Sequence, residues 1–544
     1  RSPSRGLGDV YKRQKYLCAI AFLLGLFSCD SFLTTPPLDQ ISEDQWWNDK
    51  SQTEMMVKGA YNYIYGTEEV AYRDCFSDNG MRRSSAQTEI GNGTYTTQNS
   101  AVKSEWKYAS IAKLNYIIEG LEKAKDKITE AEYLRFSAEV RFIRAFVYYD
   151  MIFYFGDIPL ITKTLTVAES RETSRQPRQE VLDFILSELE DFVLPNINAL
   201  EIKESGRVNE QTVNAYLSRI FLYEKNYEKV LEYTDKVIKS GDYELYPDYD
   251  ELFRPQSDGN NKEVIFERQY SSPLVVHDLN RNLSYVSGVY SGWSNVLALN
   301  ELVDDYECLN GHPVSECESL GCEYVQKRKD AETETHRGEF DFRDPRLNTT
   351  ITWPYKEWVV DGNVRCRYGV DDPNSGDYVQ KETHMTGYMC EKWIDLRGEY
   401  ADRTLADKNM TILRYADILL MRAEALIELN QNLPEAVSLI NQIRTRVNMP
   451  VIGMASQSVL RERLRHERRI ETAFEGLRYF DIIRWRIADK VKKGKVYGAR
   501  LKAVNENMDH KYVEERFWND KMYLFPIPQE AMDNNGNLVQ NPDW

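Results

Sequence analysis

Two stretches of the sequence combine aromatic rings with polar side chains in segments that are typical of loops. Residues 72–83 read YRDCFSDNGMRR and continue to Tyr95, and residues 285–295 read YVSGVYSGWSN. Aromatic rings stack on the apolar C–H faces of sugar rings, while amide, carboxylate and guanidinium groups hydrogen bond to sugar hydroxyls. Our ligand-binding candidates are Tyr72, Asn79, Arg82, Tyr285, Tyr290 and Trp293. Each of them has an alternative role in a packed core or in a contact with a partner protein.

The sequence contains only incomplete versions of catalytic motifs. The run HERRI at residues 466–470 begins like the helix of a zinc protease, but Ile470 stands where the second histidine ligand belongs. The run GWSNV at residues 292–296 lacks the final glycine of a nucleophile elbow. A glycosidase needs two carboxylates at a defined separation, and a chain with 86 acidic residues does not exclude such a pair. We expect a binding protein that is not an enzyme and uses no cofactor.

Cysteine use agrees with an exported protein. Apart from Cys18 and Cys29, the chain contains Cys75, Cys308, Cys317, Cys322, Cys366 and Cys390. An oxidising compartment permits disulfides between them, in a pairing that sequence alone does not determine. Cys308, Cys317 and Cys322 lie close together with His312 between them, but their spacing lacks the C-x2-C pair of zinc sites. We therefore favour disulfides or free thiols over a bound metal.

Composition sets limits on the partners of the chain. With 544 residues and 42% hydrophobic content, the chain can bury a large core. Its net charge of -17 disfavours nucleic acid as the main partner, because phosphate binding depends on clustered lysine and arginine.

The first residues predict export and lipidation. Residues 1–14 show no apolar period, and we set them aside as an N-terminal scar. The apolar run 16–27 follows basic residues and is shorter than the roughly 20 residues that span a bilayer, so it predicts a signal peptide. Residues 26–29, LFSC, resemble a lipoprotein signal box, which predicts a lipid on Cys29; an incidental cysteine in a secreted protein is the alternative.

Helical periodicity dominates both ends of the remaining chain. We expect one compact body made of an N-terminal helical region, residues 29–240, and a C-terminal region, residues 241–544. Between about residues 241 and 411, short β-prone pieces such as 263–267 and 348–353 alternate with turn residues. The fold class is mostly α, with tetratricopeptide-like helix pairs supporting a loop-rich, mixed ligand-binding region. The expected helices are 53–64, 111–125, 132–155, 178–192, 210–225, 227–240, 412–429 and one opening at Leu433.

Residues 464–486, LRHERRIETAFEGLRYFDIIRWR, have the most regular pattern in the chain. Ile470, Ala473, Phe474 and Leu477 fall at i, i+3, i+4 and i+7, which predicts one buried helical face. Charges of both signs lie three or four residues apart on the other face, where we expect them to pair along the helix. Gly476 indicates a kink or a close contact, because glycine costs about 1 kcal/mol relative to alanine inside a helix.

Several segments resemble the SusD/RagB family of surface lipoproteins from Bacteroidetes-type bacteria. They are CDSFL at 29–33, RFIRAFVYYDMIFYFGDIPL at 141–160, ILRYADILLMRAEA at 412–425, INQIRTRVNMP at 440–450, ERRIETAFEGLRYFDIIRW at 467–485, and LFPIPQEAMDNNGNLVQNPDW at 524–544. The resemblance implies an outer-membrane, surface-exposed lipoprotein that captures an oligosaccharide. It also implies a partner, a SusC-like TonB-dependent transporter, to which the ligand is delivered. The ligand-contact residues of this family vary too much to be carried over one by one.

Three other functions remain open. A peptide-binding relative would work in the same uptake machinery, because some members of the family serve peptide uptake. A secreted glycosidase with a helical body would release reducing sugar from a bound glycan. A protein scaffold would use the helix pairs as a concave groove and would not depend on Trp293.

Overall fold

The computed structural model describes residues 46–544 apart from residues 84, 260, 286–288, 332–338, 361, 369–373, 375–385, 398–401 and 501–509. The expected signal peptide and Cys29 lie outside the described residues. Among the helices of the described part, none combines the length and the apolar character that a membrane crossing requires.

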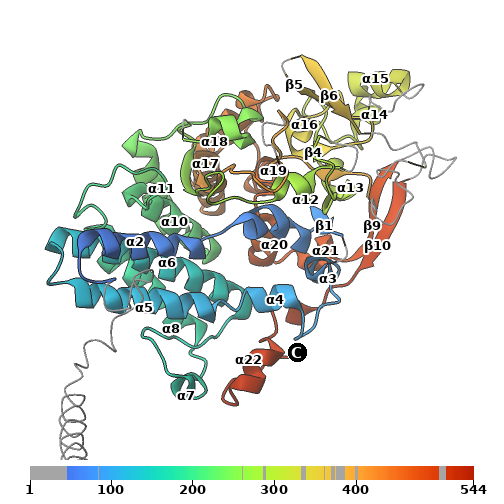
Figure 1. Cartoon of the computed structure of the whole chain (residues 1–544). Helices are drawn as coiled ribbons and strands as arrows, with labels where there is room; N and C mark the ends of the chain where they lie inside the picture. Colours follow the sequence, from blue (N-terminus) through green and yellow to red (C-terminus); the bar gives the residue numbers. More distant parts are fainter. Residues whose placement is uncertain are drawn as a thin grey trace, which may run out of the picture.

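The first half of the chain forms helices almost exclusively (Figure 1). Its α-helices are α2 Lys50–Ala60, α3 Ala86–Asn92, α4 Ser100–Ser104, α5 Tyr108–Ala124, α6 Glu130–Phe155, α7 Val167–Ser170, α8 Arg178–Ser187, α9 Leu194–Asn196, α10 Glu210–Tyr223 and α11 Tyr227–Ser240. The single turns of 3-10 or π helix are η3 Tyr61–Tyr63, η4 Glu68–Tyr72, η5 Arg73–Phe76 and η6 Glu188–Val193. A short strand, β1 Gly80–Arg82, separates η5 from α3.

The second half mixes short strands with helices, as the sequence indicates. Its strands are β2 Val264–Arg268, β3 Val296–Ala298, β4 Ile351–Thr352, β5 Glu357–Val360, β6 Asn363–Arg367, β7 Met389–Cys390, β8 Met410–Arg414, β9 Gly494–Arg500 and β10 His510–Arg516. Its α-helices are α12 Leu279–Leu283, α13 Asn300–Val303, α14 Cys317–Leu320, α15 Glu323–Ala331, α16 Arg346–Thr350, α17 Tyr415–Glu428, α18 Leu433–Arg446, α19 Gln457–Glu471, α20 Arg478–Trp485, α21 Ala488–Val491 and α22 Gln529–Asn534. The 3-10 turns are η7 Glu251–Phe253, η8 Pro255–Ser257 and η11 Asp520–Tyr523.

Helix α6 is the centre of the helical half. A capping box begins it, in which the Thr129 side chain accepts from the Glu132 amide and the Glu132 carboxylate accepts from the Thr129 amide. Gly156, at φ 71°, ends it. Nearly every residue of α6 is buried, and its aromatic rings pack in the largest core cluster. The aromatic stripe of this helix is therefore core, as its spacing predicts.

Two helix pairs stack on one another beside α6 (Figure 1). Helix α10 packs against α11, α17 packs against α18, and α11 joins the two pairs by packing on α17. Helix α10 is buried from Thr212 to Tyr223, so it packs on all sides. The structure thus shows the mostly helical class with paired helices that the sequence predicts.

Several expected element boundaries differ from the structure, and two of them reflect strand pairing. Residues 410–414 form β8, which pairs antiparallel with β2, so the helix expected from residue 412 begins at Tyr415. The β-prone segment 348–353 begins inside α16 and only Ile351 and Thr352 are extended. In both places a tertiary strand partner decides the backbone conformation, which local propensity does not encode.

The segment 464–486 is two helices rather than one. Helix α19 ends at Glu471, and Phe474 at φ 59° and Gly476 at φ 75° turn the chain before α20 begins. A Cβ on residue 476 would lie 2.3 Å from the Glu69 carbonyl oxygen, so the glycine permits a close backbone contact. The expectation of a close approach is confirmed, and the continuous helix is not.

Arg484 pairs with Asp481 three residues away at 2.8 Å, as expected, but most charges of this segment pair with other elements. Glu471 is fully buried, and its carboxylate contacts Arg346 at 2.9 Å, Arg414 at 2.7 Å, and Arg446. Burial alone would raise the pKa of Glu471, but the three guanidinium groups more than offset it and hold the pKa well below its usual range. The surrounding rings Tyr249 and Phe253 complete this buried ionic core.

Candidate ligand-binding site

A short antiparallel pairing brings the two candidate stretches together. Strand β1 pairs with β3, with Arg82 opposite Val296, and the Arg83 amide donates to the Asn295 carbonyl at 3.0 Å. Figure 1 shows β1 near α3 and α12 in the central part of the molecule. Residues that are far apart in the sequence thus become neighbours at one edge of a small sheet.

Residues 292–295 are laid along α12 by backbone hydrogen bonds. The amide of Trp293 donates to the Arg281 carbonyl at 2.8 Å, and the amide of Ser294 donates to the Ser284 carbonyl at 3.0 Å. The amide of Asn295 donates to the Asn282 carbonyl at 2.7 Å. These contacts fix the orientation of the Trp293 side chain, since the backbone on both sides of it is held by the helix.

Trp293 is an exposed aromatic ring with a cation behind it. Its side chain is 44% exposed. The Arg281 guanidinium lies 4.2 Å from the ring centroid, and Asp278 pairs with that guanidinium. A cation over one ring face leaves the rest of the indole available for stacking. This arrangement is suited to holding a flat, weakly apolar ligand surface.

A polar cavity of about 380 Å³ lies beside Trp293. Arg83 connects the two, because its guanidinium donates to the Trp293 carbonyl at 3.4 Å and also lines the cavity. The lining offers carboxylate, guanidinium, amide and hydroxyl groups, from Glu68, Arg82, Arg83, Ser85, Ala86, Gln87, Ser100, Ala101, Ser104 and Asn295. We call Trp293 together with this cavity the Trp293 surface. Its donors and acceptors match a ligand rich in hydroxyl groups.

Arg82 and Glu68 set the charge of this cavity. The Arg82 guanidinium lies 4.3 Å from the centroid of the Tyr72 ring. Burial raises the pKa of Glu68, and the positive charge of Arg82 partly opposes that rise. The cavity therefore carries two guanidinium groups, from Arg82 and Arg83, and a carboxylate with a reduced tendency to ionise, and these groups offer both donors and acceptors to hydroxyl groups.

Four of the six candidates lie inside the core. Asn79 donates to Asp74 at 3.0 Å and accepts from Arg469 at 2.9 Å. Tyr285 packs against Trp358 and donates to the Cys366 sulfur at 2.9 Å, and Tyr290 donates to the Asp395 carboxylate at 2.6 Å. Tyr72 is buried beneath Arg82. These side chains support the site from within, while Trp293 and Arg82 remain reachable from solvent.

Sequence reasoning missed Arg281, Glu68 and Gln87. Nothing in the local sequence of α12 indicates that Arg281 backs an aromatic ring, because Trp293 reaches it through the fold of the intervening loop. Arg83 and Asn295 lie at the ends of the two aromatic stretches, and that position was the one available signal.

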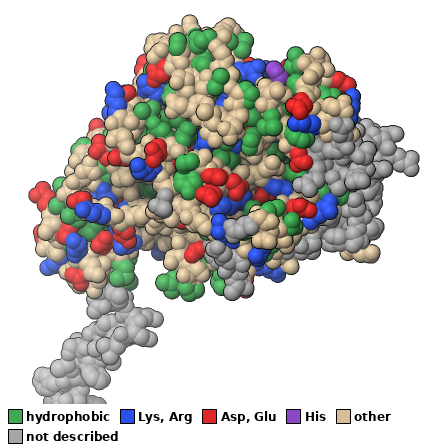
Figure 2. Space-filling view, turned by 90° about the horizontal axis from the view of Figure 1, so that it is seen from above, with side chains coloured by type: hydrophobic (Ala, Val, Ile, Leu, Met, Phe, Trp, Pro, Cys, Tyr) green, Lys and Arg blue, Asp and Glu red, His purple; other side chains and the backbone are tan. Residues whose placement is uncertain are grey.

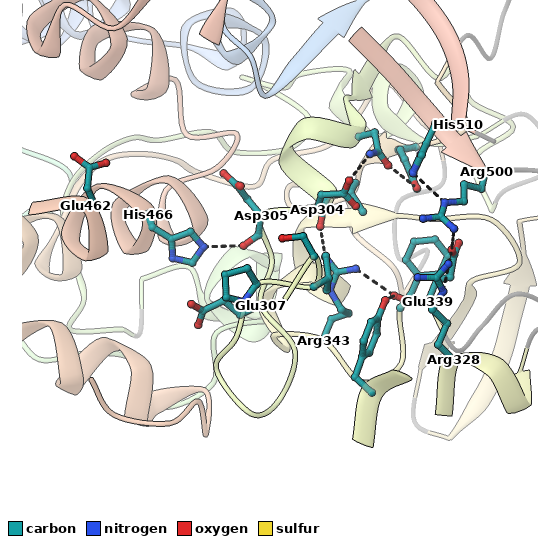
Figure 3. Close-up of a pocket in the computed structure, with 18 of the residues that line it drawn as sticks. Asp304, Asp305, Glu307, Arg328, Glu339, Arg343, Glu462, His466, Arg500 and His510 are labelled. Carbon is teal, nitrogen blue, oxygen red and sulfur yellow. Dashed lines mark hydrogen bonds and ion pairs between the residues drawn. The ribbon is translucent and has the colours of Figure 1, made fainter. Parts of the chain in front are cut away.

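A larger cavity, of about 740 Å³, is lined by residues of α13, α15, α19 and the β9–β10 hairpin (Figure 3). We call it the charged cavity. His466 on α19 points toward Asp305 and hydrogen bonds to its carbonyl at 2.7 Å. Arg328, Glu339 and Arg500 gather at the opposite side of the cavity.

The carboxylates of the charged cavity are engaged by other side chains. Glu307 contacts Arg444 at 2.9 Å and Arg463 at 3.2 Å, and Glu339 lies 3.7 Å from both Arg328 and Arg500. Asp304 accepts from Asn300 at 2.6 Å, Asp305 pairs with Arg469, and Glu462 lies 3.7 Å from Arg465. Size alone would select this cavity, but a ligand there would have to compete with existing ion pairs.

Two family models cover most of the described chain. The model described as the SusD family matches residues 262–544, and the model described as "Starch-binding associating with outer membrane" matches residues 39–222. The chain belongs to the SusD family.

Individual relatives match over nearly the full length. The chain is similar to SusD-like protein P2 of Formosa agariphila, 25% identical over 553 residues that cover 96% of this chain and 98% of that protein. It is similar to the starch-binding protein SusD of Bacteroides thetaiotaomicron, 24% identical over 478 residues, 82% of this chain and 79% of that protein. Its fold is similar to the crystal structure of a SusD-like carbohydrate-binding protein from Bacteroides fragilis, with a TM-score of 0.80, 27% identity, and coverage of 91% and 100%.

Proposed function

We propose that this protein binds an oligosaccharide at the Trp293 surface and performs no chemistry on it. The observation that carries the proposal is an exposed indole, backed by Arg281, beside a cavity of mixed hydrogen-bonding groups. The indole supplies the stacking face, and the cavity supplies hydrogen-bond partners for the sugar hydroxyls. A hydroxyl that is buried without such a partner costs binding free energy.

The names of the relatives support a carbohydrate ligand. The Bacteroides thetaiotaomicron relative is a starch-binding protein, and the Bacteroides fragilis structure is of a carbohydrate-binding protein. We extend that ligand class to this chain, together with the absence of catalysis, because the first relative aligns with it over 79% of its own length and the second shares its fold over its full length.

The direct test is calorimetry or affinity electrophoresis of the purified protein against a panel of polysaccharides, with Trp293→Ala alongside. We expect binding of at least one glycan and a loss of at least tenfold, about 1.4 kcal/mol, in the variant. Tyr512→Ala is the matched control, because Tyr512 is 52% exposed on β10 and does not line the cavity. Equal loss in both variants, or undiminished binding in Trp293→Ala, would place the site elsewhere.

We also propose that the protein is anchored to the outer membrane through a lipid on Cys29, faces outward, and passes its ligand to a SusC-like TonB-dependent transporter. The family model that associates residues 39–222 with the outer membrane supports the compartment. Mass spectrometry of the mature N-terminus tests the lipid, and Cys29→Ser should move the protein from the membrane fraction to the soluble one. Affinity purification of the membrane-bound protein should recover the transporter.

Peptide binding is the second candidate, and the charged cavity favours it. Its lining combines both signs of charge with apolar groups such as Phe340 and Val459, which matches the mixed chemistry of a peptide. A parallel calorimetric screen of peptide pools separates the two functions. Peptide binding without glycan binding would overturn the proposal of an oligosaccharide ligand. Release of reducing sugar from a bound glycan would overturn the proposal that the protein performs no chemistry.

A further inference from the structure

Three cysteines that are separate in the sequence meet in one cluster. The sulfur atoms of Cys308, Cys317 and Cys322 all lie within 4.8 Å of one another. All three are free thiols in the structure. Cys308 and Cys317 are fully buried, and Cys322 is partly exposed. The sequence lacks a C-x2-C pair, which argued against a metal, but the fold brings the three sulfurs together without that spacing.

The backbone holds two of the cysteines together by a helix-ending motif. After α14, the amide of Cys322 donates to the Cys317 carbonyl at 3.0 Å, and the amide of Gly321 donates to the Glu318 carbonyl at 3.3 Å. Gly321 has φ 65°. This is the Schellman pattern, which brings the side chains at its two ends into contact. Cys317 and Cys322 occupy those two ends.

A second turn brings in the third cysteine. The amide of Cys308 donates to the His312 carbonyl at 2.9 Å, and Gly311, at φ 76°, donates back to the Cys308 carbonyl at 2.8 Å. An isolated bridge pairs Cys308 with Arg343. The side chain of Cys308 therefore faces the Schellman turn from a segment that is anchored independently of it.

Apolar side chains enclose the three sulfurs. Val314, Tyr324, Val325 and Phe342 pack with Cys308, Cys317 and Cys322 in a small core of their own. Such a shell limits access of water to the inner two sulfurs, while the partial exposure of Cys322 leaves one side open. A metal site with three protein ligands has the same arrangement, because its fourth coordination position is open to water.

We propose that Cys308, Cys317 and Cys322 bind one soft or borderline d10 cation, of which Zn²⁺ is the representative, through three sulfurs. Each thiol releases its proton to solvent as its sulfur–metal bond forms, so the site binds the dication with a net charge of one minus. Sulfurs around one zinc at about 2.3 Å lie about 3.8 Å apart, a separation that the present triangle reaches with shifts on the order of 1 Å. Water on the Cys322 side completes the coordination.

The competing arrangement is a disulfide between two of the three. A disulfide would bring one pair of sulfurs to about 2.05 Å and leave the third thiol alone in the apolar shell. A metal instead uses all three sulfurs at once, and the structure has assembled three. We therefore favour the metal, and the experiment below is designed to separate the two.

The bound cation would hold one wall of the charged cavity. Pro313, Val314 and Ser315, which lie between Cys308 and Cys317, line that cavity, as does Tyr324 just after Cys322. Joining the three cysteines through a metal would fix this segment, which lies between α13 and α14, to the turn that follows α14. Its role is structural, and it leaves the Trp293 surface unaffected.

The test is a titration of the reduced, purified protein with Cd²⁺ and Zn²⁺ in the absence of oxygen. Near-ultraviolet absorption reports cadmium–thiolate bonds, and elemental analysis after desalting reports the zinc retained. We expect one equivalent of metal, and hydrogen exchange of residues 308–322 that speeds up when a chelator is added. Cys322→Ser should weaken binding at least tenfold and reduce the absorption by about a third.

The control is Cys366→Ser, because Cys366 is also partly exposed but lies outside the cluster; it should leave metal binding unchanged. Circular dichroism establishes that each variant is folded, and Cys317→Ser provides a second cluster variant. Retention of less than a tenth of an equivalent overturns the proposal. So does mass spectrometry of protein prepared without reductant that finds two of the three cysteines joined by a disulfide.

Discussion

Among the arginine side chains that lie over aromatic rings, two, in the ionic core and at the Trp293 surface, have opposite consequences. In the ionic core, Arg446 lies 5.0 Å from the centroid of Tyr249 and pairs with Glu471 and Glu263. At the Trp293 surface, Arg281 lies 4.2 Å from the centroid of Trp293 and pairs with Asp278. The residue types are the same, but Tyr249 is 5% exposed and Trp293 is 44% exposed.

The difference shows that residue types alone do not identify a binding site. In the ionic core Tyr249 and Phe253 lie against arginines and the carboxylates are paired with arginines, and Glu307 in the charged cavity is paired in the same way. At the Trp293 surface one ring is held firmly and left accessible. Figure 2 shows acidic and basic side chains interspersed over the face seen from above, so neither sign of charge gathers in a single patch there. Five measurements test this contrast.

The largest effect belongs to the ionic core. Glu471→Gln leaves Arg346, Arg414 and Arg446 with less negative charge in a buried setting, and we expect a loss of about 3–5 kcal/mol in the free energy of unfolding. Urea denaturation measures it. Glu462→Gln, on the exposed side of the same helix, should change stability by less than about 0.5 kcal/mol. Comparable effects of the two changes would contradict the assignment of Glu471 to the core.

Acid should weaken the segment that carries the Trp293 surface. His277 precedes α12; its Nε2 donates to the Lys408 carbonyl at 3.0 Å and its Nδ1 accepts from the Leu279 amide at 3.3 Å. Burial lowers the pKa of His277 to about 4, from 6.5. The unfolded chain therefore binds the proton first, and stability falls as the pH drops from about 6.5 to about 4, by about 3 kcal/mol in total.

The contribution of His277 is isolated by comparison with His277→Gln, since carboxylates also titrate in acid. Denaturation midpoints at several pH values should show a steeper fall for the unchanged protein than for the variant. If the pH profiles of the unchanged protein and of His277→Gln were parallel, the imidazole of His277 would not be buried in its neutral form.

At the Trp293 surface the effect should appear in binding rather than in stability. Trp293→Ala removes an exposed ring, so we expect the glycan affinity to fall at least tenfold, about 1.4 kcal/mol, with little change in the free energy of unfolding. Calorimetry and urea denaturation of the same preparations check both halves. If Trp293→Ala lowered the free energy of unfolding and kept its glycan affinity, Trp293 would have a structural role like the residues of the ionic core.

A smaller effect is expected at the cation behind the ring. Arg281→Ala removes the guanidinium that backs Trp293, and we expect glycan affinity to fall by about 0.5–1 kcal/mol, a few-fold. Arg281→Lys should recover part of the loss, because an ammonium keeps the charge but not the planar stacking. Full affinity in both variants would mean that the ring is positioned by its backbone alone.

The charged cavity should give no effect on glycan binding. Arg463→Ala opens the ion pair with Glu307 without touching the Trp293 surface. We expect unchanged glycan affinity within the error of calorimetry. A tenfold loss would move the glycan site into this cavity.

Much of the scaffold was predictable, because the helical period of residues 210–223 and 227–240 predicts both helices. The site was predictable only as two stretches of chain. Whether a loop tyrosine points inward depends on distant partners: Tyr290 finds Asp395, and Tyr285 finds Trp358. The same holds for the break at Gly476, which exists because the Glu69 backbone approaches it from the other end of the chain. The local sequence pattern predicts which segments are helices, but contacts with distant residues decide which loop side chains are exposed.

The pairing of β1 with β3 has a consequence for how the protein matures. It joins side chains such as Arg83 and Trp293, which are 210 positions apart, and contacts of such separation form late because a long loop must close first. A chain interrupted before residue 293 would carry the complete helix pair of α10 and α11 and still have no Trp293 surface. Ligand binding thus reports that residues from 68 to 295 have come together, which makes it a stricter probe of maturation than helical content.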